Sequence, residues 1–248
     1  MEIKWMLKEI MMKLIALPTM ASLVRRMRGI GWIGGLLLVM TPAWGAFQLE
    51  STGIVLEEKE GRVSFTIQNT SQAPILLASQ VEDLDNAGFS KNVLLSPPIT
   101  RIEPGQSQQV NFLLKKGSTL THEVMLKASF EGIMQVVENS AQMPIRQSVS
   151  LIIQPAAVAM TATPWSDLKI TRDRQALVLS NTGKHVIRFA PQLKLNPDGG
   201  FLPLDSLYLM AGEARRVPVN GSPVSIGLTP LSRYGARLPE VTLPVSVE

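Results

Sequence analysis

One pattern occurs twice along this chain of 248 residues, and it constrains the fold more than any other feature. Each time, an alternating apolar run ends in Asn-Thr, and a Gly turn farther along opens onto a polar strand. The two asparagines, Asn69 and Asn181, lie 112 residues apart (181 minus 69), and the turn glycines, Gly105 and Gly212, lie 107 apart (212 minus 105). A spacing of about 100 residues is the size of one all-β sandwich. The repeat therefore predicts two such sandwiches in tandem.

The first 45 residues have the organisation of an export signal. Basic residues at 25–28 precede an apolar segment at 29–40, and Ala43 and Gly45 supply the small side chains of a cleavage site. The apolar segment is about a dozen residues long, which is too short to span a bilayer. We therefore predict a cleaved signal peptide over residues 1–45, while an uncleaved anchor and a later start at an internal methionine stay open as alternatives.

Removing this leader changes what the charge implies. Residues 1–45 hold six of the 24 basic and two of the 20 acidic residues, so the mature chain carries 18 of each. The basic pI of about 9.5 belongs to the leader, and it indicates no nucleic-acid or anionic-membrane partner. The chain has no cysteine, so hydrophobic cores rather than disulfides must hold an exported fold. We expect a periplasmic protein with no stable membrane insertion after cleavage, because no later apolar run is long enough to span.

The mature chain reads as all-β throughout. Its segments alternate apolar and polar residues, and turn residues separate them about every ten positions. Seven strands in each half predict two immunoglobulin-like sandwiches, with strands at 53–57, 62–69, 75–83, 92–96, 108–114, 123–130 and 143–154, then 168–171, 176–180, 186–191, 207–210, 213–219, 224–228 and 240–247. Pro155 ends the last strand of the first half because it has no amide proton. We place the first domain at 46–155, a hinge at 156–164 and the second domain at 165–248.

The residues that usually carry chemistry are sparse and scattered. There are two histidines, His122 and His185, and no cysteine, so we expect no metal site. The carboxylates at 57–60 and 82–85 lie in predicted turns, where solvated loop charge is the ordinary role. Neither a Gly-x-Ser-x-Gly nucleophile motif nor a Gly-rich phosphate loop after a strand occurs. The sequence therefore predicts no enzyme, no catalytic residue and no cofactor.

The strand that closes the first half is unusually long and apolar. One of its faces carries Met143, Ile145, Gln147, Val149 and Leu151. As the last strand of a sandwich it is expected at a sheet edge, where unpaired backbone groups can accept a further strand. This combination is typical of β-augmentation, and we predict Met143, Ile145, Val149 and Leu151 as a donor row for a partner strand. In the alternative interpretation, 149–153 are core and 143–145 are loop.

At this point the chain resembles the PapD-like periplasmic chaperones of the chaperone/usher pilus pathway, as a divergent member. The resemblance rests on segments 52–57, 65–70, 93–105, 151–156 and 232–236, the last being Ser-Arg-Tyr-Gly-Ala. It implies two immunoglobulin-like domains in a boomerang arrangement, with no cofactor. It also implies that the donor strand keeps a pilus or fimbrial subunit folded until an outer-membrane usher takes it.

The chain departs from that family at its charged positions. The resemblance implies a cleft Arg and Lys that hold the carboxylate of the subunit, but Gly53 and Ser150 stand at these places. Arg146 is the nearest candidate for a substitute anchor. Gln154 and Arg233 replace the Arg and Asp of the family's interdomain ion pair, so that pair is not expected here.

Two other functions stay open at this point. A two-domain β-sandwich adhesin or minor pilus subunit would contain an incomplete sandwich that needs a foreign strand. A chaperone-like protein that has lost subunit binding would fit the missing anchors. Two complete sandwiches and an apolar donor edge favour the chaperone.

Overall fold

The computed structural model describes residues 46–85, 87–117, 120–134, 144–197 and 199–247. The predicted signal peptide and Met143 of the donor row lie outside these ranges. Within them the chain is built of β-strands with short 3-10 turns, among them η2 (Phe89–Asn92) and η3 (Pro164–Asp167). None of the helical turns in the described ranges is long and apolar enough to cross a membrane.

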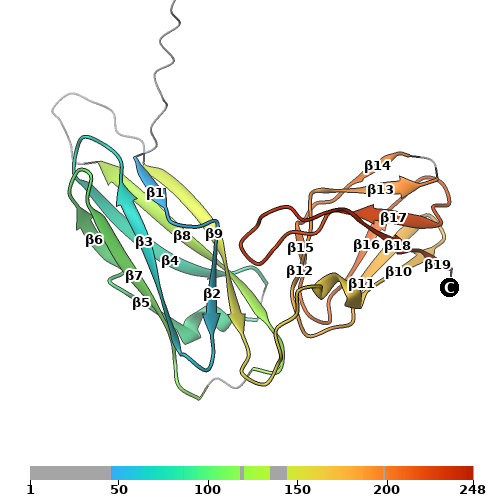
Figure 1. The fold of residues 1–248 in the computed structure, drawn as a ribbon, viewed down its shortest axis with the longest axis horizontal. Coiled ribbons are helices and arrows are strands. Elements are labelled where there is room, and N and C mark those ends of the chain that lie inside the picture. Colours follow the sequence, from blue (N-terminus) through green and yellow to red (C-terminus); the bar gives the residue numbers. More distant parts are fainter. Residues whose placement is uncertain (1–45, 86, 118–119, 135–143, 198, 248) are drawn as a thin grey trace, which may run out of the picture. The chain divides into compact units, whose positions relative to one another are not determined.

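Strands β1 to β9 form a first sandwich of two sheets (Figure 1). One sheet has the order β1-β3-β7-β5 and the other the order β2-β9-β8-β4-β6. The chain therefore changes sheets between β1 and β2, since β1 pairs with β3 whereas β2 pairs in parallel with β9. The strands are β1 (Phe47–Leu49), β2 (Gly53–Glu57), β3 (Arg62–Asn69), β4 (Ile75–Asp83), β5 (Val93–Ser96), β6 (Ile99–Ile102), β7 (Ser107–Leu114), β8 (Val124–Met134) and β9 (Ile145–Gln154).

Strands β10 to β19 form a second sandwich. Its sheets have the orders β16-β11-β10-β19 and β14-β13-β17-β18, and β12 pairs with β15 in a short ribbon. The strands are β10 (Leu168–Asp173), β11 (Ala176–Asn181), β12 (Ile187–Arg188), β13 (Gln192–Asn196), β14 (Phe201–Pro203), β15 (Tyr208–Leu209), β16 (Ala214–Pro218), β17 (Ser225–Leu228), β18 (Val241–Pro244) and β19 (Ser246–Val247).

Asn69, the first of the two repeated asparagines, is buried at a corner of the first sandwich. The side-chain amide of Asn69 donates to the carbonyl oxygens of Ala73 and Ile102, each at 2.9 Å, and Asn69 is fully buried. Its backbone carbonyl accepts the amide of Gly105 at 3.0 Å. Gly105 has φ of 72°, a conformation that favours glycine. The pattern thus ties the end of β3 to the turn before β7.

Asn181 forms the same corner in the second sandwich. Its amide donates to the carbonyl oxygens of His185 at 2.7 Å, Leu209 at 3.2 Å and Met210 at 3.0 Å. Its own carbonyl accepts the amide of Gly212, which has φ of 75°. The structural equivalence of the two corners explains why the pattern occurs twice, and it confirms the prediction of tandem sandwiches.

Each sandwich has its own hydrophobic core between its sheets. In the first, the ring of Phe65 stacks on Phe130 with centroids 5.3 Å apart, and Phe112 meets Phe130 edge-on at 6.4 Å. In the second, Phe189 is 1% exposed among leucines, isoleucines and valines from both sheets. Because the sequence contains no cysteine, these cores rather than disulfides stabilise the two sandwiches.

The all-β fold class is confirmed, and many strands lie where the sequence predicts them. Strands β2, β3 and β4 have the predicted bounds, whereas β12 is shorter than the predicted strand at 186–191. Four strands were not predicted: β1, β6, β13 and β14. Strand β9 ends at Gln154 and β10 begins at Leu168, and the domain limits placed between them stay a prediction.

Candidate binding site

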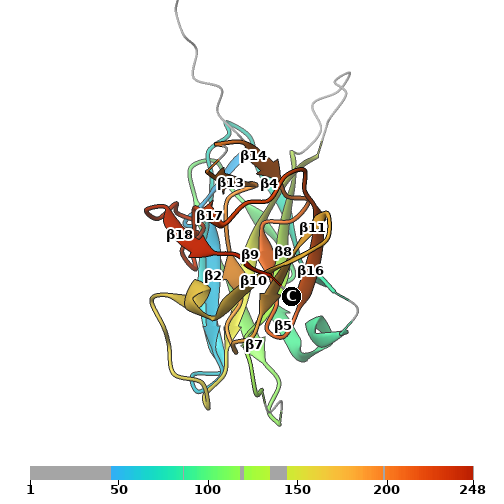
Figure 2. The same ribbon diagram turned by 90° about the vertical axis from the view of Figure 1, so that its right-hand side faces the viewer.

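Strand β9 has a long paired flank and a flank that is paired along only half of the strand. On the first flank β8 pairs with it from Gly132 opposite Ile145 to Val124 opposite Ile153. On the second flank the pairing with β2 starts at Ser150 of β9, which lies opposite Gly53 of β2. Figure 2 shows β2 beside β9, as the register requires. Within the described ranges, the backbone from Ile145 to Val149 has no strand on this flank.

The predicted donor row differs in burial before and after Ser150, the residue at which the pairing with β2 starts. Leu151 is fully buried in the first core, so the structure gives no support to its place in the donor row. Ile145 and Val149 are partly buried and pack against the same core. On the opposite face, the hydroxyl of Ser148 is 2.9 Å from that of Ser129 on β8. The apolar face of β9 thus continues the core of the sandwich toward the open flank.

Gly53 and Ser150 are paired neighbours across β2 and β9. A Cβ on Gly53 would lie 2.8 Å from the carbonyl oxygen of Arg233 and 3.0 Å from Cα of Tyr234. Thr52 beside it donates its hydroxyl to the carbonyl of Tyr234. This backbone leaves no room for an arginine at position 53. The Ser150 hydroxyl oxygen is buried and has no hydrogen-bond partner among the described residues.

Arg146 is already paired with a carboxylate. Its Nε donates to Oε2 of Glu131 at 2.8 Å, directly across the β8–β9 ladder, and both side chains reach solvent. The hydrogen bond and negative charge of Glu131 raise the pKa of Arg146. A guest carboxylate would have to compete with Glu131 for this guanidinium, so the geometry gives no support to Arg146 as the substitute anchor.

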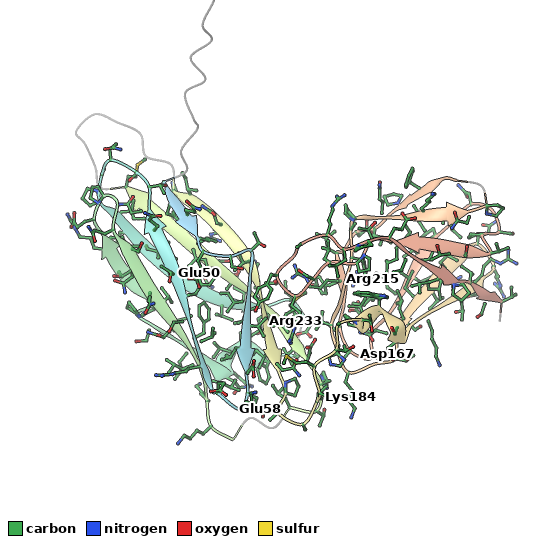
Figure 3. All side chains as sticks on the ribbon, viewed as in Figure 1. Glu50, Glu58, Asp167, Lys184, Arg215 and Arg233 are labelled. Atoms are coloured by element: carbon green, nitrogen blue, oxygen red, sulfur yellow. The ribbon has the colours of Figure 1, made fainter. Side chains whose placement is uncertain are left out.

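An ion pair connects the two sandwiches through Glu123, a residue that the resemblance did not single out. Nη2 of Arg233 donates to Oε1 of Glu123 and to Oε1 of Gln154, both at 2.6 Å (Figure 3 labels Arg233). Oε2 of Glu123 accepts the amide of Val186 at 2.9 Å, and the amide of Glu123 donates to the carbonyl of Lys184 at 2.8 Å. Position 233 therefore bears the cation of an ion pair with Glu123, whereas its contact with Gln154 is a hydrogen bond to a neutral amide.

A cavity of about 390 Å³ lies beside the open flank of β9. Ser148, Val149 and Ser150 line it from the first sandwich, and Arg188 and Tyr208 line it from the second. Arg188 is partly buried, and this burial lowers its pKa. Its Nη1 donates to the carbonyl oxygens of Ser232 at 3.3 Å and Arg233 at 2.8 Å.

The two histidines take part in ordinary local bonds. Nε2 of His185 is 2.9 Å from the carbonyl oxygen of Ala159, and Nδ1 of His122 is 3.1 Å from the hydroxyl of Thr121. In the part of the chain that the structure describes, no three His, Asp or Glu side chains gather as metal ligands do.

Glu123 and Arg188 were not predicted from the sequence. A signal existed for Glu123, because it directly precedes a strongly apolar strand, and a carboxylate buried there requires a partner. No comparable signal marks Arg188, since its surroundings come from segments distant in sequence.

Comparison with known proteins agrees with this architecture. The family model described as "Pili and flagellar-assembly chaperone, PapD N-terminal domain" matches residues 46–159. The uncharacterized fimbrial chaperone YhcA of Escherichia coli K12 is 29% identical over 191 residues, which cover 76% of this chain and 85% of YhcA.

Solved structures share the fold at lower identity. The SafB chaperone of Salmonella enterica, solved with the SafA pilin, has a TM-score of 0.70 and 18% identity and covers 81% of this chain and 97% of that one. The E. coli chaperone DraB has a TM-score of 0.68 and 18% identity, covering 80% and 98%. The CupB2 chaperone of Pseudomonas aeruginosa has a TM-score of 0.66 and 16% identity, covering 80% and 100%. Residues 46–159 therefore match the model of the PapD N-terminal domain, and over most of its length the chain is similar to a fimbrial chaperone.

Proposed function

We propose that this protein is a periplasmic chaperone that holds a pilus or fimbrial subunit by lending it strand β9, and that it delivers the subunit to an outer-membrane usher. This role involves no catalysis and no cofactor. The observation that carries the proposal is the open flank of β9 from Ile145 to Val149, which offers backbone donors and acceptors next to apolar side chains.

A guest sheet that lacks one strand is stabilised in two ways when β9 pairs with it. A guest strand on this flank would satisfy its backbone groups in a ladder, and its own apolar face would be covered by Ile145 and by Met143 of the predicted donor row. A guest sandwich that lacks one strand has both unpaired backbone groups at a sheet edge and an uncovered part of its apolar core. The complex of SafB with a pilin supports a subunit as the partner class.

Both sandwiches of this chain contain two sheets around a filled core. An adhesin or subunit that lacks a strand would leave part of its core uncovered. The architecture therefore favours a chaperone that donates a strand over an adhesin or subunit that accepts one.

Co-expression of the mature chain with candidate pilus subunits, followed by co-purification, tests the proposal. Ile145→Asp should abolish the complex, because a carboxylate on the donor row would be desolvated against the apolar groove of the guest. Val224→Asp serves as the matched control, since Val224 is 66% exposed on the second sandwich and should not affect binding.

Because Ile145 is partly buried, the milder Ile145→Ser is measured beside it, and circular dichroism checks that all variants are folded. If a folded Ile145→Asp variant still retains the subunit, the proposal that the subunit binds at the open flank of β9 is contradicted. Failure of the wild-type chain to retain any subunit would favour a chaperone-like protein that has lost binding.

A further inference from the structure

The connection between β16 and β17 has an exposed tip at residues 220–222. The residues on either side of it, Val219 and Pro223, are buried. The amide of Val219 donates to the carbonyl oxygen of Gln175 at 2.9 Å, so the start of the tip is tied to the turn between β10 and β11. The tip itself has the sequence Asn-Gly-Ser. Solvent therefore reaches an asparagine that is followed directly by a glycine.

An Asn-Gly step can react with itself. The backbone nitrogen of the glycine attacks the side-chain amide carbon of the asparagine, and the new C–N bond closes a cyclic imide. The C–N bond of the side-chain amide breaks, and ammonia leaves with the proton that the attacking nitrogen has lost. Water then opens the imide at either of its carbonyls, which gives aspartate or isoaspartate. Glycine allows the attack best because it has no Cβ to crowd the nitrogen.

Both reacting groups of this step are available in the folded chain. Within the described ranges, the amide of Gly221 donates no hydrogen bond and the side chain of Asn220 takes part in none. An attacking nitrogen that already donates to a carbonyl would first have to break that bond, whereas this nitrogen has none to break. Gly221 also has φ of 95°, a conformation that glycine adopts without strain.

The other asparagines that the structure describes lack this combination. Hydrogen bonds hold the side-chain amides of three of them, Asn69, Asn111 and Asn181. Asn196 precedes Pro197, which has no amide hydrogen to lose. Asn92 precedes Val93, whose branched side chain crowds the nitrogen and whose amide already donates to a carbonyl. The tip at 220–222 is therefore the place where the fold leaves the reaction open.

We propose that Asn220 is a site of spontaneous deamidation in the folded protein, converted through an imide with Gly221 into aspartate and isoaspartate. Water is the only other reactant. The reaction adds a negative charge to a chain whose residues 46–248 hold 18 basic and 18 acidic side chains, so it divides the protein into two charge forms. The inference is independent of the proposed function, because the tip belongs to the second sandwich and β9 to the first.

Incubation of the mature wild-type chain in mildly alkaline buffer, followed by trypsin digestion and mass spectrometry, tests the proposal. Cleavage after Arg216 and Arg233 releases residues 217–233, in which Asn220 is the only side-chain amide. The mass of this peptide should rise by about 1 Da, and fragmentation should find both aspartate and isoaspartate at position 220. The rate should increase with pH, because the attacking nitrogen must lose its proton.

Two controls make the result specific. The tryptic peptide 195–215 contains Asn196 before Pro197 and should keep its mass in the same digest. An unincubated sample, digested in parallel, measures any deamidation that the digestion itself causes. In the variant Asn220→Gln the longer side chain would need a larger ring, so residues 217–233 should keep their mass. Ser222→Ala changes the same tip outside the reacting pair and should react like the wild type.

Circular dichroism before and after incubation checks that the protein stays folded. If residues 217–233 of the folded wild type keep their mass, the tip shields the step and the proposal is overturned. Aspartate without isoaspartate overturns it as well, because water would then attack the side-chain amide directly. An equal gain in mass in Asn220→Gln would contradict the imide route in the same way.

Discussion

Replacing Arg233 with methionine should destabilise the junction between the sandwiches. The Glu123 side chain is 4% exposed, and Arg233 contributes its only cationic partner among the described residues, with Nη2 2.6 Å from Oε1. In Arg233→Met the carboxylate keeps one hydrogen bond within the described structure, from the amide of Val186. Gln154 also loses the donor to its Oε1. A buried charge is thus left without a counterion.

The expected cost follows from this geometry. Removing one partner of a buried pair costs about 3 to 5 kcal/mol. The remaining Val186 bond and the 24% exposure of the Arg233 side chain place this case near the lower end, at about 3 kcal/mol. For a chain of this size about 1 kcal/mol shifts Tm by roughly 2 to 4 °C, so Arg233→Met should unfold about 6 to 12 °C earlier.

Differential scanning calorimetry of the mature chain measures this shift. Arg146→Met is the matched control, because its ion pair with Glu131 is exposed and should be worth less than about 1 kcal/mol. The double variant Glu123→Gln/Arg233→Met removes both charges and should recover part of the loss. If Arg233→Met melts within about 1 °C of the wild type, the reasoning about a buried, unpaired Glu123 is refuted.

Three further predictions concern single sites. Asn181→Ala should lower the free energy of unfolding in urea by at least about 2 kcal/mol, because three backbone carbonyls lose their donor; an unchanged urea midpoint would contradict the corner assignment. Gly53→Ala should cost about 1 to 3 kcal/mol in thermal unfolding, since its Cβ would meet the Arg233 backbone, whereas Gly200→Ala, with no atom within 4 Å, should be nearly neutral; equal losses would show that the contact is not tight. Burial acts to raise the pKa of Asp83, but hydrogen bonds from Ser90 prevail and lower it, so the stability it contributes is present above about pH 3.9 and is lost as the pH falls through the folded pKa. Asp83→Asn should therefore lose less stability on acidification below about pH 4 than the wild type, and parallel pH profiles would refute this.

The sequence predicted those strands whose own residues alternate between apolar and polar and are bounded by turn residues. Strand β3 alternates apolar and polar residues and ends at a buried Asn, so local pattern and tertiary role agree. Strand β13 also alternates, with Leu193 and Leu195 buried, but prolines at 191 and 197 make the segment look like a loop. Strand β1 is only three residues long and is held by pairing with β3, so its formation depends on a distant partner.

The candidate edge was predictable in part, because a last strand tends to lie at a sheet edge. How much of that edge is open was not predictable. Its limit depends on where β2 begins to pair, and that point depends on the change of sheets between β1 and β2. For the same reason Leu151 could not be distinguished from Ile145 by alternation, since both lie on one face of the strand.

The charged groups were harder to predict because they act over long distances in sequence. Glu123 and Arg233 are 110 residues apart, and a comparison of single positions drew attention to Gln154 and Arg233 but not to Glu123. In the folded chain the cation is at 233 and its carboxylate is at 123, so the electrostatic contact persists between different partners. A charge missing from one position is therefore weak grounds for concluding that the interaction is missing.

The ion pair also supports a second contact at the same place. The carbonyl oxygen of Arg233 accepts from Arg188, while the guanidinium of Arg233 is bound to Glu123 and Gln154 of the first sandwich. The segment that joins the sandwiches is thus the segment that satisfies the buried donors of Arg188. Loosening the ion pair should therefore also loosen the backbone that accepts from Arg188, so the stability lost in Arg233→Met is not confined to one contact.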